Sequence, residues 1–372
     1  MDPIQSDPTD PERCARLALW SIRGLSSRSI AAAAAAFGST LAACRAPREA
    51  LADALDLGAG ARARLLAASE DLVALGAALR AQVAARGGRF LLRGEEGYPD
   101  FGGLVDPPEA LWVRGDLAGA GGTGADGLPP AVAVVGARKA DPGAIHLARR
   151  FGASLAAAGY TVVSGGALGV DAAAHDGANE AGGATLAVLG SGLLRPLPAR
   201  NRRLFGRMLA GKGGLASELP PLEGARAEHF PRRNRLIAAL ARAVVVVRAA
   251  AGSGSLYTAR AAVSLGRPVF VVPAPDLGPA AAGGEALLAE GAAAVRSVEE
   301  LLPALRGEAV NAAPAKGSDA VLDALGLLPA SVVEVAAAAG LDQAEVARRL
   351  AALCAKGLVR PAGPGRFLRA PH

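Results

Sequence analysis

Residues 229–235 combine the side-chain types that bind nucleic acids. The segment reads His-Phe-Pro-Arg-Arg-Asn-Arg and is followed at once by an apolar segment, residues 236–240. Arginine guanidinium groups fork onto phosphate oxygens and stack on flat rings, and the neighbouring Phe230 offers a face on which a base could stack. The alternative is a solvent-exposed basic turn, because charged runs usually face water. The residues around this segment decide between the two interpretations.

Four glycine-rich segments follow short apolar runs that we predict to be strands. In an open α/β sheet, ligands bind at the carboxyl ends of the strands, and backbone N–H groups bind anions where such a turn opens a helix. Alternatively, the glycines only permit tight turns. Four such turns together with the arginines favour a phosphate-binding rim, by which we mean the loops at the carboxyl edge of the predicted sheet. The segments are 136–139, 164–171, 190–192 and 252–259.

The predicted roles on this rim divide into charge, backbone and ring contacts. Arginine side chains would neutralise phosphates, backbone amides of the 164–166 and 253–255 segments would hold further phosphates, and Phe230 would stack a base. Asn234 would orient its loop or contact a base edge. The predicted site for single-stranded DNA consists of Gly136, Arg138, Lys139, Ser164, Gly165, Gly166, Phe230, Arg232, Arg233, Asn234, Arg235, Ser253, Gly254 and Ser255.

Sequence patterns of common enzyme classes are absent. The segment 211–213, Gly-Lys-Gly, lacks the spacing and the Ser/Thr of a Walker A loop, and no G-x-S-x-G elbow occurs. Asp171 and His175 lie four residues apart on a predicted helix, but a capping aspartate and a packed histidine explain them at least as well. For Glu218 we favour an ion pair with a nearby arginine over catalysis. We therefore predict no catalytic residue, and no cofactor or metal site, since the histidines and cysteines are scattered.

Between residues 131 and 305 the chain alternates between predicted strands and helices. The strands are short, β-branched and continuously apolar, as buried parallel strands are, and alanine-rich helical segments separate them. Asp141-Pro142 supplies an N-cap and a first-turn proline for one helix, and Gly159 ends it. This pattern predicts a Rossmann-like, doubly wound, mostly parallel α/β sheet. The predicted strands are 131–135, 161–163, 185–189, 243–247 and 269–272.

The flanking segments predict further domains. Residues 11–95 read as all-helical, with a weak helix-hairpin-helix turn at Gly24–Ser26. Residues 119–124 match G-x-G-x-x-G, but prolines 129 and 130 follow where a helix would have to open, so we reject a dinucleotide site in favour of a flexible linker. The predicted domains are a helical (SAM- or helix-hairpin-helix-like) module, 1–95; a connector and flexible linker, 96–130; a Rossmann-like DNA-binding domain, 131–305; a linker, 306–318; and a winged helix, 319–372.

The predicted winged helix is a second nucleic-acid candidate. Its third helix opens at Asp342, with Glu345 three residues later, and carries basic side chains, as does the predicted wing. Winged helices often lay the third helix in a DNA groove, while many serve as protein-interaction modules. Both readings stay open, because the exposed face of this helix is rich in alanine. The basic residues are Arg348, Arg349, Lys356, Arg366 and Arg369.

Composition permits an anionic partner without demanding one. The 372 residues include 40 Lys and Arg against 34 Asp and Glu, and the excess basic residues are nearly all arginine, which also suits a GC-rich coding bias. No apolar run approaches the roughly 20 residues that span a bilayer, and the N-terminus lacks the pattern of a signal peptide. The three distant cysteines, 14, 44 and 354, fit buried thiols in a reducing compartment. We therefore expect a cytoplasmic protein with no membrane contact.

An ordered set of motifs resembles the DNA-processing protein A family (DprA/Smf). The set consists of the rim segments described above and of several residues that lie between them in the sequence. The resemblance covers essentially the whole chain. Together the motifs are far more specific than any one alone. They are Val134–Arg138, Ser164–Asp171 with Ala174-His175, Val188–Gly192, Pro198, Asn201, Ser217-Glu218, Phe230–Arg235, Ser253–Leu256 and Thr258-Ala259.

The resemblance implies a non-catalytic bacterial protein of the cytoplasm. Members of that family bind single-stranded DNA, protect incoming strands during natural transformation, and help to load the recombinase RecA. They act as homodimers through the Rossmann-like domain, and they require no nucleotide or other cofactor. The expected partners are thus single-stranded DNA, RecA and a second copy of the chain.

Five positions depart from the pattern of that family. Leu197 stands where tyrosine is usual, Gly252 where a basic residue is common, and Ala274 where glycine is common. Arg248 stands where an acidic residue is usual and would add a phosphate contact. Glu285 stands where asparagine is common and would weaken one.

Two other functions remain as alternatives. Nucleoside-monophosphate phosphoribohydrolases have a related sheet, but their P-G-G-x-G-T-x-x-E signature supplies a catalytic glutamate, and residues 252–259 contain no carboxylate. A transcription regulator would instead bind duplex DNA through the winged helix. Release of a free base from a nucleotide would support the first, and footprinting on duplex DNA would support the second.

Overall fold

Residues 10–85 form a module of short helices whose boundaries follow from local capping. The computed structural model describes residues 10–117, 130–306, 320–325, 330–363 and 365–369. Asp10 accepts a hydrogen bond from the backbone of the first turn of α1, and Ser26 forms a capping box with Ser29 at α2. The helices are α1 (Pro11–Ser21), α2 (Ser27–Phe37), α3 (Thr40–Arg45), α4 (Arg48–Ala54), α5 (Ala59–Leu66) and α6 (Leu72–Ala84).

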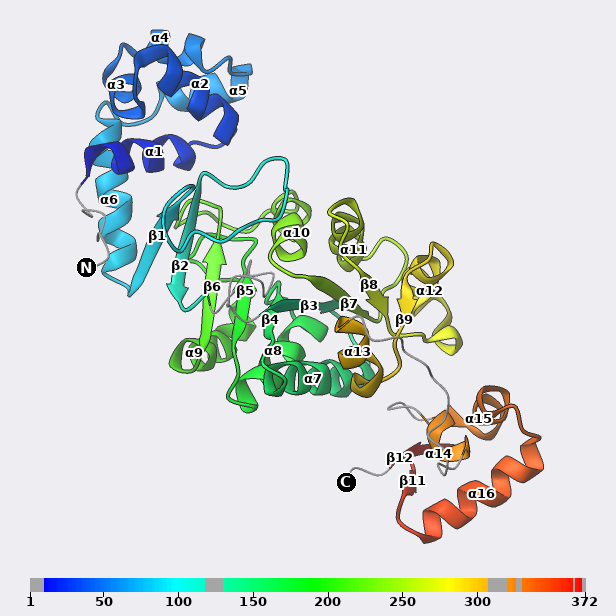
Figure 1. The fold of residues 1–372 in the computed structure, drawn as a ribbon. Coiled ribbons are helices and arrows are strands. Elements are labelled where there is room, and N and C mark those ends of the chain that lie inside the picture. Colours follow the sequence, from blue (N-terminus) through cyan, green and yellow to red (C-terminus); the bar gives the residue numbers. More distant parts are fainter. Residues whose placement is uncertain (1–9, 118–129, 307–319, 326–329, 364, 370–372) are drawn as a thin grey trace.

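The centre of the molecule is a nine-stranded sheet in the order β1-β2-β6-β5-β4-β3-β7-β8-β9. The seven strands from β6 to β9 pair in parallel, and β1 and β2 pair antiparallel at one edge (Figure 1). The strands are β1 (Gly88–Leu92), β2 (Ala110–Gly115), β3 (Ala131–Gly136), β4 (Thr161–Ser164), β5 (Thr185–Val188), β6 (Gly213–Ser217), β7 (Ala243–Val247), β8 (Val269–Val271) and β9 (Ala293–Ala294).

Helices cover both faces of this sheet, which explains why its strands are continuously apolar. Alternate residues of a strand point to opposite faces. In β3, Val132 and Val134 pack into the cluster built on α7, α8 and α13, while Ala133 and Val135 pack into the cluster built on α10, α11 and α12. The helices of this region are α7 (Pro142–Ala157), α8 (Val170–Glu180), η1 (Ala199–Asn201), α9 (Arg202–Ala210), α10 (His229–Ala239), α11 (Gly254–Ser264), η2 (Pro275–Ala280), α12 (Ala282–Ala289) and α13 (Val298–Leu305).

The strand order places a topological switch point between β3 and β7. From β3 the chain proceeds outward through β4, β5 and β6, and from β7 it proceeds in the opposite direction through β8 and β9. The loops that leave the carboxyl ends of β3 and β7 therefore diverge and open a crevice, which is where open α/β sheets bind ligands. The prediction of a mixed α/β fold with a mostly parallel sheet is confirmed, and each of the five predicted strands is present.

Two predictions about the segment before the sheet are wrong. Residues 88–92 were expected to be helical, yet they form the edge strand β1, and the expected connector contains β2. Both strands are short, and their burial depends on distant partners: β2 pairs with β6, and Phe90 of β1 packs against Trp112 of β2 with ring centroids 5.9 Å apart. A pattern confined to five or six residues does not reveal such pairing. The sheet therefore begins at residue 88 rather than at 131.

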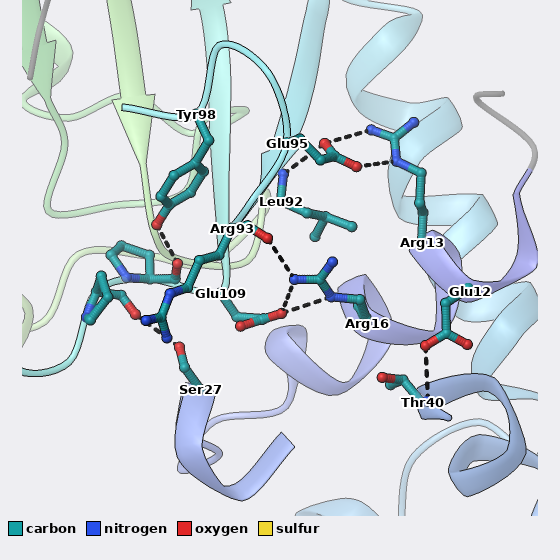
Figure 2. Close-up of polar contacts among 12 residues, drawn as sticks. Glu12, Arg13, Arg16, Ser27, Thr40, Leu92, Arg93, Glu95, Tyr98 and Glu109 are labelled. Atoms are coloured by element: carbon teal, nitrogen blue, oxygen red, sulfur yellow. Dashed lines mark hydrogen bonds and ion pairs between the residues drawn. The ribbon is translucent and has the colours of Figure 1, made fainter. Parts of the chain in front are cut away.

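Ion pairs and partly buried hydrogen bonds hold the helical module against this edge of the sheet (Figure 2). The guanidinium of Arg13 donates two hydrogen bonds to Glu95, and that of Arg16 donates to Glu109, which is 7 % exposed. The hydroxyl of Ser27 donates to the carbonyl of Pro107. Charge-assisted bonds at partly buried positions are worth more than surface pairs. We infer that the helical module packs against the sheet and is not a separate domain on a linker.

The described residues after 319 form a small separate unit with its own apolar core around Val335, Val346 and Leu350. Asp342 caps α16 by accepting bonds from two backbone N–H groups. The expected linker at 119–124, and the linker expected at 306–318 apart from Arg306, lie outside the described residues. No helix in the described parts of the chain is long and apolar enough to cross a membrane. The elements are α14 (Ala320–Ala324), β10 (Ala330–Ser331), α15 (Val332–Ala339), α16 (Gln343–Ala355), β11 (Val359–Pro361) and β12 (Arg366–Arg369), with sheet order β10-β12-β11.

Candidate nucleic-acid interface

The segment that suggested nucleic-acid binding is the opening of a helix, not a turn. Helix α10 runs from His229 to Ala239, so its residues repeat every 3.6 positions. Arg233 and Asn234 fall on the buried face with Ile237, whereas Arg232 falls on the exposed face. The three arginines therefore have different environments and cannot share one role. The apolar residues Leu236, Ile237 and Leu240, at i, i+1 and i+4, are the sequence signal that indicates this helix.

An open pocket of about 280 Å³ lies where α10 and α11 begin, beside the loop after β3. The first turns of both helices contribute to its wall, and neither N-cap side chain forms a capping bond. Helix N-termini carry partial positive charge, so their convergence favours an anion. This attraction comes mainly from the helix dipoles at α10, because Pro231 has no N–H group and that of His229 donates to the carbonyl of Arg226. The pocket is lined by Arg138, Ala227, Phe230, Pro231, Asn234, Gly254 and Tyr257.

Arg138 and Phe230 form a stacked pair in this pocket. The guanidinium carbon of Arg138 lies 4.7 Å from the centre of the Phe230 ring, within the range of a cation–π contact. Arg138 and its neighbour Lys139 are both exposed in the loop after β3. The stack holds a cation next to an aromatic face, so a phosphate and a base of the same nucleotide chain can be bound at adjacent points. The structure thus brings two of the predicted residues together.

The buried side chain of Glu218 forms ion pairs with two arginines of α10, Arg232 and Arg235. Glu218, at the end of β6, is 3 % exposed and lies 3.5 Å from Arg232 and 2.5 Å from Arg235. Burial raises the pKa of Glu218, and the two arginines oppose that rise. Arg235 also donates to the carbonyl of Asp106, so it is largely committed within the protein. The predicted ion-pair role of Glu218 is confirmed, and Arg232 is left as the more exposed cation.

Replacing Glu218 with glutamine should strengthen the binding of single-stranded DNA. The substitution keeps a hydrogen-bond acceptor for the arginines but removes one negative charge, so the net charge of the cluster rises. We expect severalfold tighter binding at low salt and a salt-dependence slope steeper by up to about 0.7. Polarisation titrations over a salt series measure both. Glu180→Gln, at an exposed pair with Arg149, is the control. An unchanged slope for Glu218→Gln would contradict a DNA path over Arg232.

Arg233 was predicted to neutralise a phosphate, and the structure contradicts that role. Its side chain is 4 % exposed, and its guanidinium donates to the carbonyls of Gly165 and Val188 and to the side chain of Asn234. Burial lowers the pKa of Arg233 to about 10, while the Asp171 carboxylate opposes that shift. Arg233 therefore connects the loop after β4 to the last residue of β5 through hydrogen bonds inside the protein.

The amides of the 164–166 segment are likewise not presented to a ligand. The N–H groups of Gly165 and Ala167 donate to the carboxylate of Asp171, and the hydroxyl of Ser164 donates to the carbonyl of Val134. Ser164, Gly165 and Gly166 are all buried. A Cβ atom on Gly165 would lie 2.5 Å from the Arg233 guanidinium, so glycine here makes room for that arginine. The N–H groups that were expected to hold a phosphate therefore bind the carboxylate of Asp171 instead.

Asp171 and His175 both have structural surroundings, but Asp171 is not the helix cap that one interpretation of the sequence expected. It is the second residue of α8, whose N-cap is Gly169, and it accepts hydrogen bonds from the N–H groups of Gly165 and Ala167 in the preceding loop. Burial raises the pKa of its carboxyl group, and the Arg233 charge opposes that rise. His175 is fully buried, and its Nδ1 lies 2.7 Å from the Thr185 hydroxyl oxygen. Since that hydroxyl donates to the carbonyl of Val162, the histidine N–H donates to the hydroxyl. Burial and the nearby Arg233 hold the pKa of His175 at about 3.

The depressed pKa of His175 predicts acid lability. The ordinary histidine pKa is 6.5, so below that pH the unfolded chain takes up a proton that the folded chain refuses until about pH 3. This contribution is complete above pH 6.5 and is lost as the pH falls toward 3, by up to about 1.4 kcal/mol per pH unit. Urea unfolding measured across this range tests it. His175→Gln, which retains an N–H donor but does not titrate, should flatten the pH dependence; an equal slope would show that other groups cause it.

The loop after β7 lies at the pocket, as expected. The side-chain amide of Asn234 donates to the carbonyl of Gly254, so Asn234 orients this loop, one of its two predicted roles. The hydroxyl oxygens of Ser253 and Ser255 lie 2.9 Å apart, with Ser255 buried. Gly254 is exposed and opens α11. Gly136, by contrast, is needed for packing, because a Cβ there would lie 1.9 Å from the carbonyl oxygen of Val247.

Two departures from the family pattern have internal roles. Arg248 was expected to add a phosphate contact, but it is 3 % exposed and its Nε lies 3.0 Å from the carboxylate of Asp141, the cap of α7. Glu285 accepts a hydrogen bond from the backbone N–H of Ala274. The first expectation is therefore wrong, because Arg248 is buried and paired with Asp141. Tyr257, which the sequence reasoning did not single out, is instead 52 % exposed at the pocket.

The basic residues of the C-terminal unit are partly neutralised by its own glutamates. Arg348 and Arg349 both lie 2.7 Å from Glu345, and Arg366 lies 3.1 Å from Glu334. Such exposed pairs are weak individually, but they reduce the positive field of this unit. The combination of cations, helix N-termini and an aromatic ring at the pocket is the stronger candidate for nucleic acid.

Comparisons with known proteins agree on one family. A family model described as DNA recombination-mediator protein A matches residues 89–306. The chain is 36% identical over 339 residues to a putative DNA processing protein DprA of Mycobacterium tuberculosis, covering 84% of this chain and 83% of that protein. It is 39% identical over 208 residues to protein Smf of Escherichia coli, which covers 56% of this chain but only 54% of that protein.

Two solved structures are similar in fold. The X-ray structure of DNA processing protein A from Streptococcus pneumoniae superposes with a TM-score of 0.63 and 28% sequence identity, covering 78% of this chain and 96% of that one. The structure of DNA processing protein A from Helicobacter pylori, which was solved to explain its single-stranded DNA binding mode, has a TM-score of 0.52 and 29% identity over 59% of this chain and 96% of that one. With its switch-point pocket and a family match over most of its sheet, this chain belongs to the DNA recombination-mediator protein A family, DprA/Smf.

Proposed function

We propose that this chain binds single-stranded DNA at the pocket between α10, α11 and the loop after β3. One observation carries the proposal: the Arg138–Phe230 stack stands where two helix N-termini converge. Cations and helix ends attract phosphates from several directions, while the ring accepts a base. The Helicobacter pylori relative, whose structure addresses single-stranded DNA binding, supports the same conclusion.

The pocket favours an unpaired strand over a duplex. Its ring lies in a recess rather than on a projecting helix, so a base must leave its stack to reach Phe230. Bases of a single strand can be splayed out at little cost, whereas those of a duplex must first be unpaired. Of the predicted cations, Arg138, Lys139 and Arg232 are exposed and available for the backbone. This set is smaller than predicted, because Arg233 and Arg235 serve the protein itself.

The biological setting that we propose rests on the family. A DNA recombination mediator would protect incoming single strands during natural transformation and help to load RecA, acting as a cytoplasmic homodimer without a catalytic step. We further propose that the sheet domain is Rossmann-like and that the helices and three-stranded sheet after residue 319 form a winged helix. The order of helices and strands in that unit supports this assignment.

A polarisation titration tests the proposed function. Labelled single-stranded and duplex oligonucleotides of about 15 nucleotides are titrated from 50 to 200 mM salt. We expect preferential binding of the single strand, with a log–log salt slope of about −2, which corresponds to three neutralised phosphates at about −0.7 each. Equal or tighter binding of the duplex would instead favour a regulator that acts through the C-terminal unit. Release of free base from a nucleotide would favour a hydrolase.

A further inference from the structure

We propose that Tyr257 is a second base-stacking ring of this pocket, so that the pocket grips a base through two aromatic side chains. The inference rests on the proposed function and adds a residue that the sequence motifs did not select. Tyr257 lines the same pocket as Phe230 but comes from a different helix, the first turn of α11. A base that enters the pocket therefore meets aromatic surface on two walls.

The position of Tyr257 is fixed by the residues on either side of it. Leu256 is 8 % exposed and Thr258 is 1 % exposed, so the first turn of α11 is anchored in the core and Tyr257 projects outward. The Asn234 side chain donates to the carbonyl of Gly254, which ties this turn to α10 and hence to Phe230. The two rings are thus held on a common frame and need little ordering when a strand binds.

Exposure of this ring is not explained by packing. Half of the Tyr257 side chain is in contact with water, although a tyrosine buries a large apolar area when it packs. Two helix N-termini and Arg138 surround it, so its surroundings suit a nucleotide, which is anionic and flat, better than an apolar peptide. The rings of Phe230 and Tyr257 and the cation of Arg138 line one pocket, and together they match the chemistry of a base with its phosphate.

The test uses Tyr257→Leu in the full chain, with strands that carry one 2-aminopurine or one abasic site. Leucine keeps apolar bulk and helix propensity but offers no aromatic face. We expect affinity for single-stranded DNA to fall about 5- to 30-fold, the lower part of the range for base–aromatic stacking. Quenching of 2-aminopurine at the pocket position should fall as well. The salt slope should stay unchanged, because no charge is removed. A substitution that displaced Arg138 from its phosphate contact would change the slope.

Three comparisons make the result decisive. Tyr257→Phe should bind like the wild type, and Val263→Ala, at an exposed site six residues further along the same helix, should have no effect. An abasic site at the pocket position should weaken the wild type more than it weakens Tyr257→Leu. Wild-type affinity in Tyr257→Leu, or an equal abasic penalty in both proteins, would overturn the inference while leaving the proposed function intact. Failure of the wild type to prefer single strands would overturn both.

Discussion

Replacing Arg138 with alanine is expected to weaken the binding of single-stranded DNA roughly tenfold to a hundredfold. The side chain is exposed and stacks on Phe230, so in the proposed complex its N–H groups would contact a phosphate beside the Phe230 ring. A hydrogen bond to a charged group contributes about 1.5–3 kcal/mol, which corresponds to this change in affinity. The salt-dependence slope should also become shallower by about 0.7, since one neutralised phosphate is lost.

Two further variants separate the charge of Arg138 from its shape. Arg138→Lys keeps the cation but loses the planar fork, so we expect the wild-type salt slope with reduced affinity. Arg242→Ala removes an arginine that directly precedes β7, at the amino ends of the parallel strands and away from the pocket. It should leave binding unchanged. Titration of all three variants over one salt series provides the measurement. An Arg138→Ala protein with wild-type affinity and slope would exclude this loop from the binding site.

Replacing Arg233 with alanine is expected to destabilise the fold by about 3–5 kcal/mol, the cost of removing one member of a buried charge network. Its guanidinium bonds to two loop carbonyls, and it balances the buried carboxylate of Asp171. At about 2–4 °C per kcal/mol for a domain of this size, the melting temperature should fall by roughly 6–20 °C. Calorimetry or urea unfolding measures the loss.

The neighbouring arginine is the matched control for this prediction. Arg232→Ala removes the same chemistry one residue away, from a side chain that is 43% exposed, and should weaken DNA binding while changing stability little. A double variant, Arg233→Met with Asp171→Asn, should recover part of the lost stability, because it no longer buries an unbalanced charge. If Arg233→Ala retained its melting temperature and lost DNA binding instead, the internal role assigned to Arg233 would be wrong.

The sequence predicted which segments meet at the carboxyl ends of the strands better than it predicted the surroundings of each residue there. The apolar runs of β3 and β7 are continuous because both faces of the sheet are covered, and this pattern placed the following loops at one edge. Arg138 and Phe230 then fell together at the switch point. The motif resemblance was sound because several independent segments agreed.

The misassigned residues share one physical cause, which is pairing across the chain. Arg233, the 164–166 amides and Arg248 all had the chemistry to bind phosphate, but Asp171, Asp141 and loop carbonyls already engage them. Nothing in local spacing shows which polar groups the fold has paired. Treating residues 229–235 as a helix would have placed Arg233 inside, because it lies one turn before Ile237 on the buried face.

The claim that single-stranded DNA lies against α10 and α11 is tested most directly by photo-cross-linking. A single strand carrying one 5-iododeoxyuridine is irradiated in complex with the full chain, and the modified peptides are identified by mass spectrometry. Because this base reacts with aromatic rings on which it stacks, we expect adducts at Phe230 and Tyr257. Adducts confined to residues 330–369 would contradict the account.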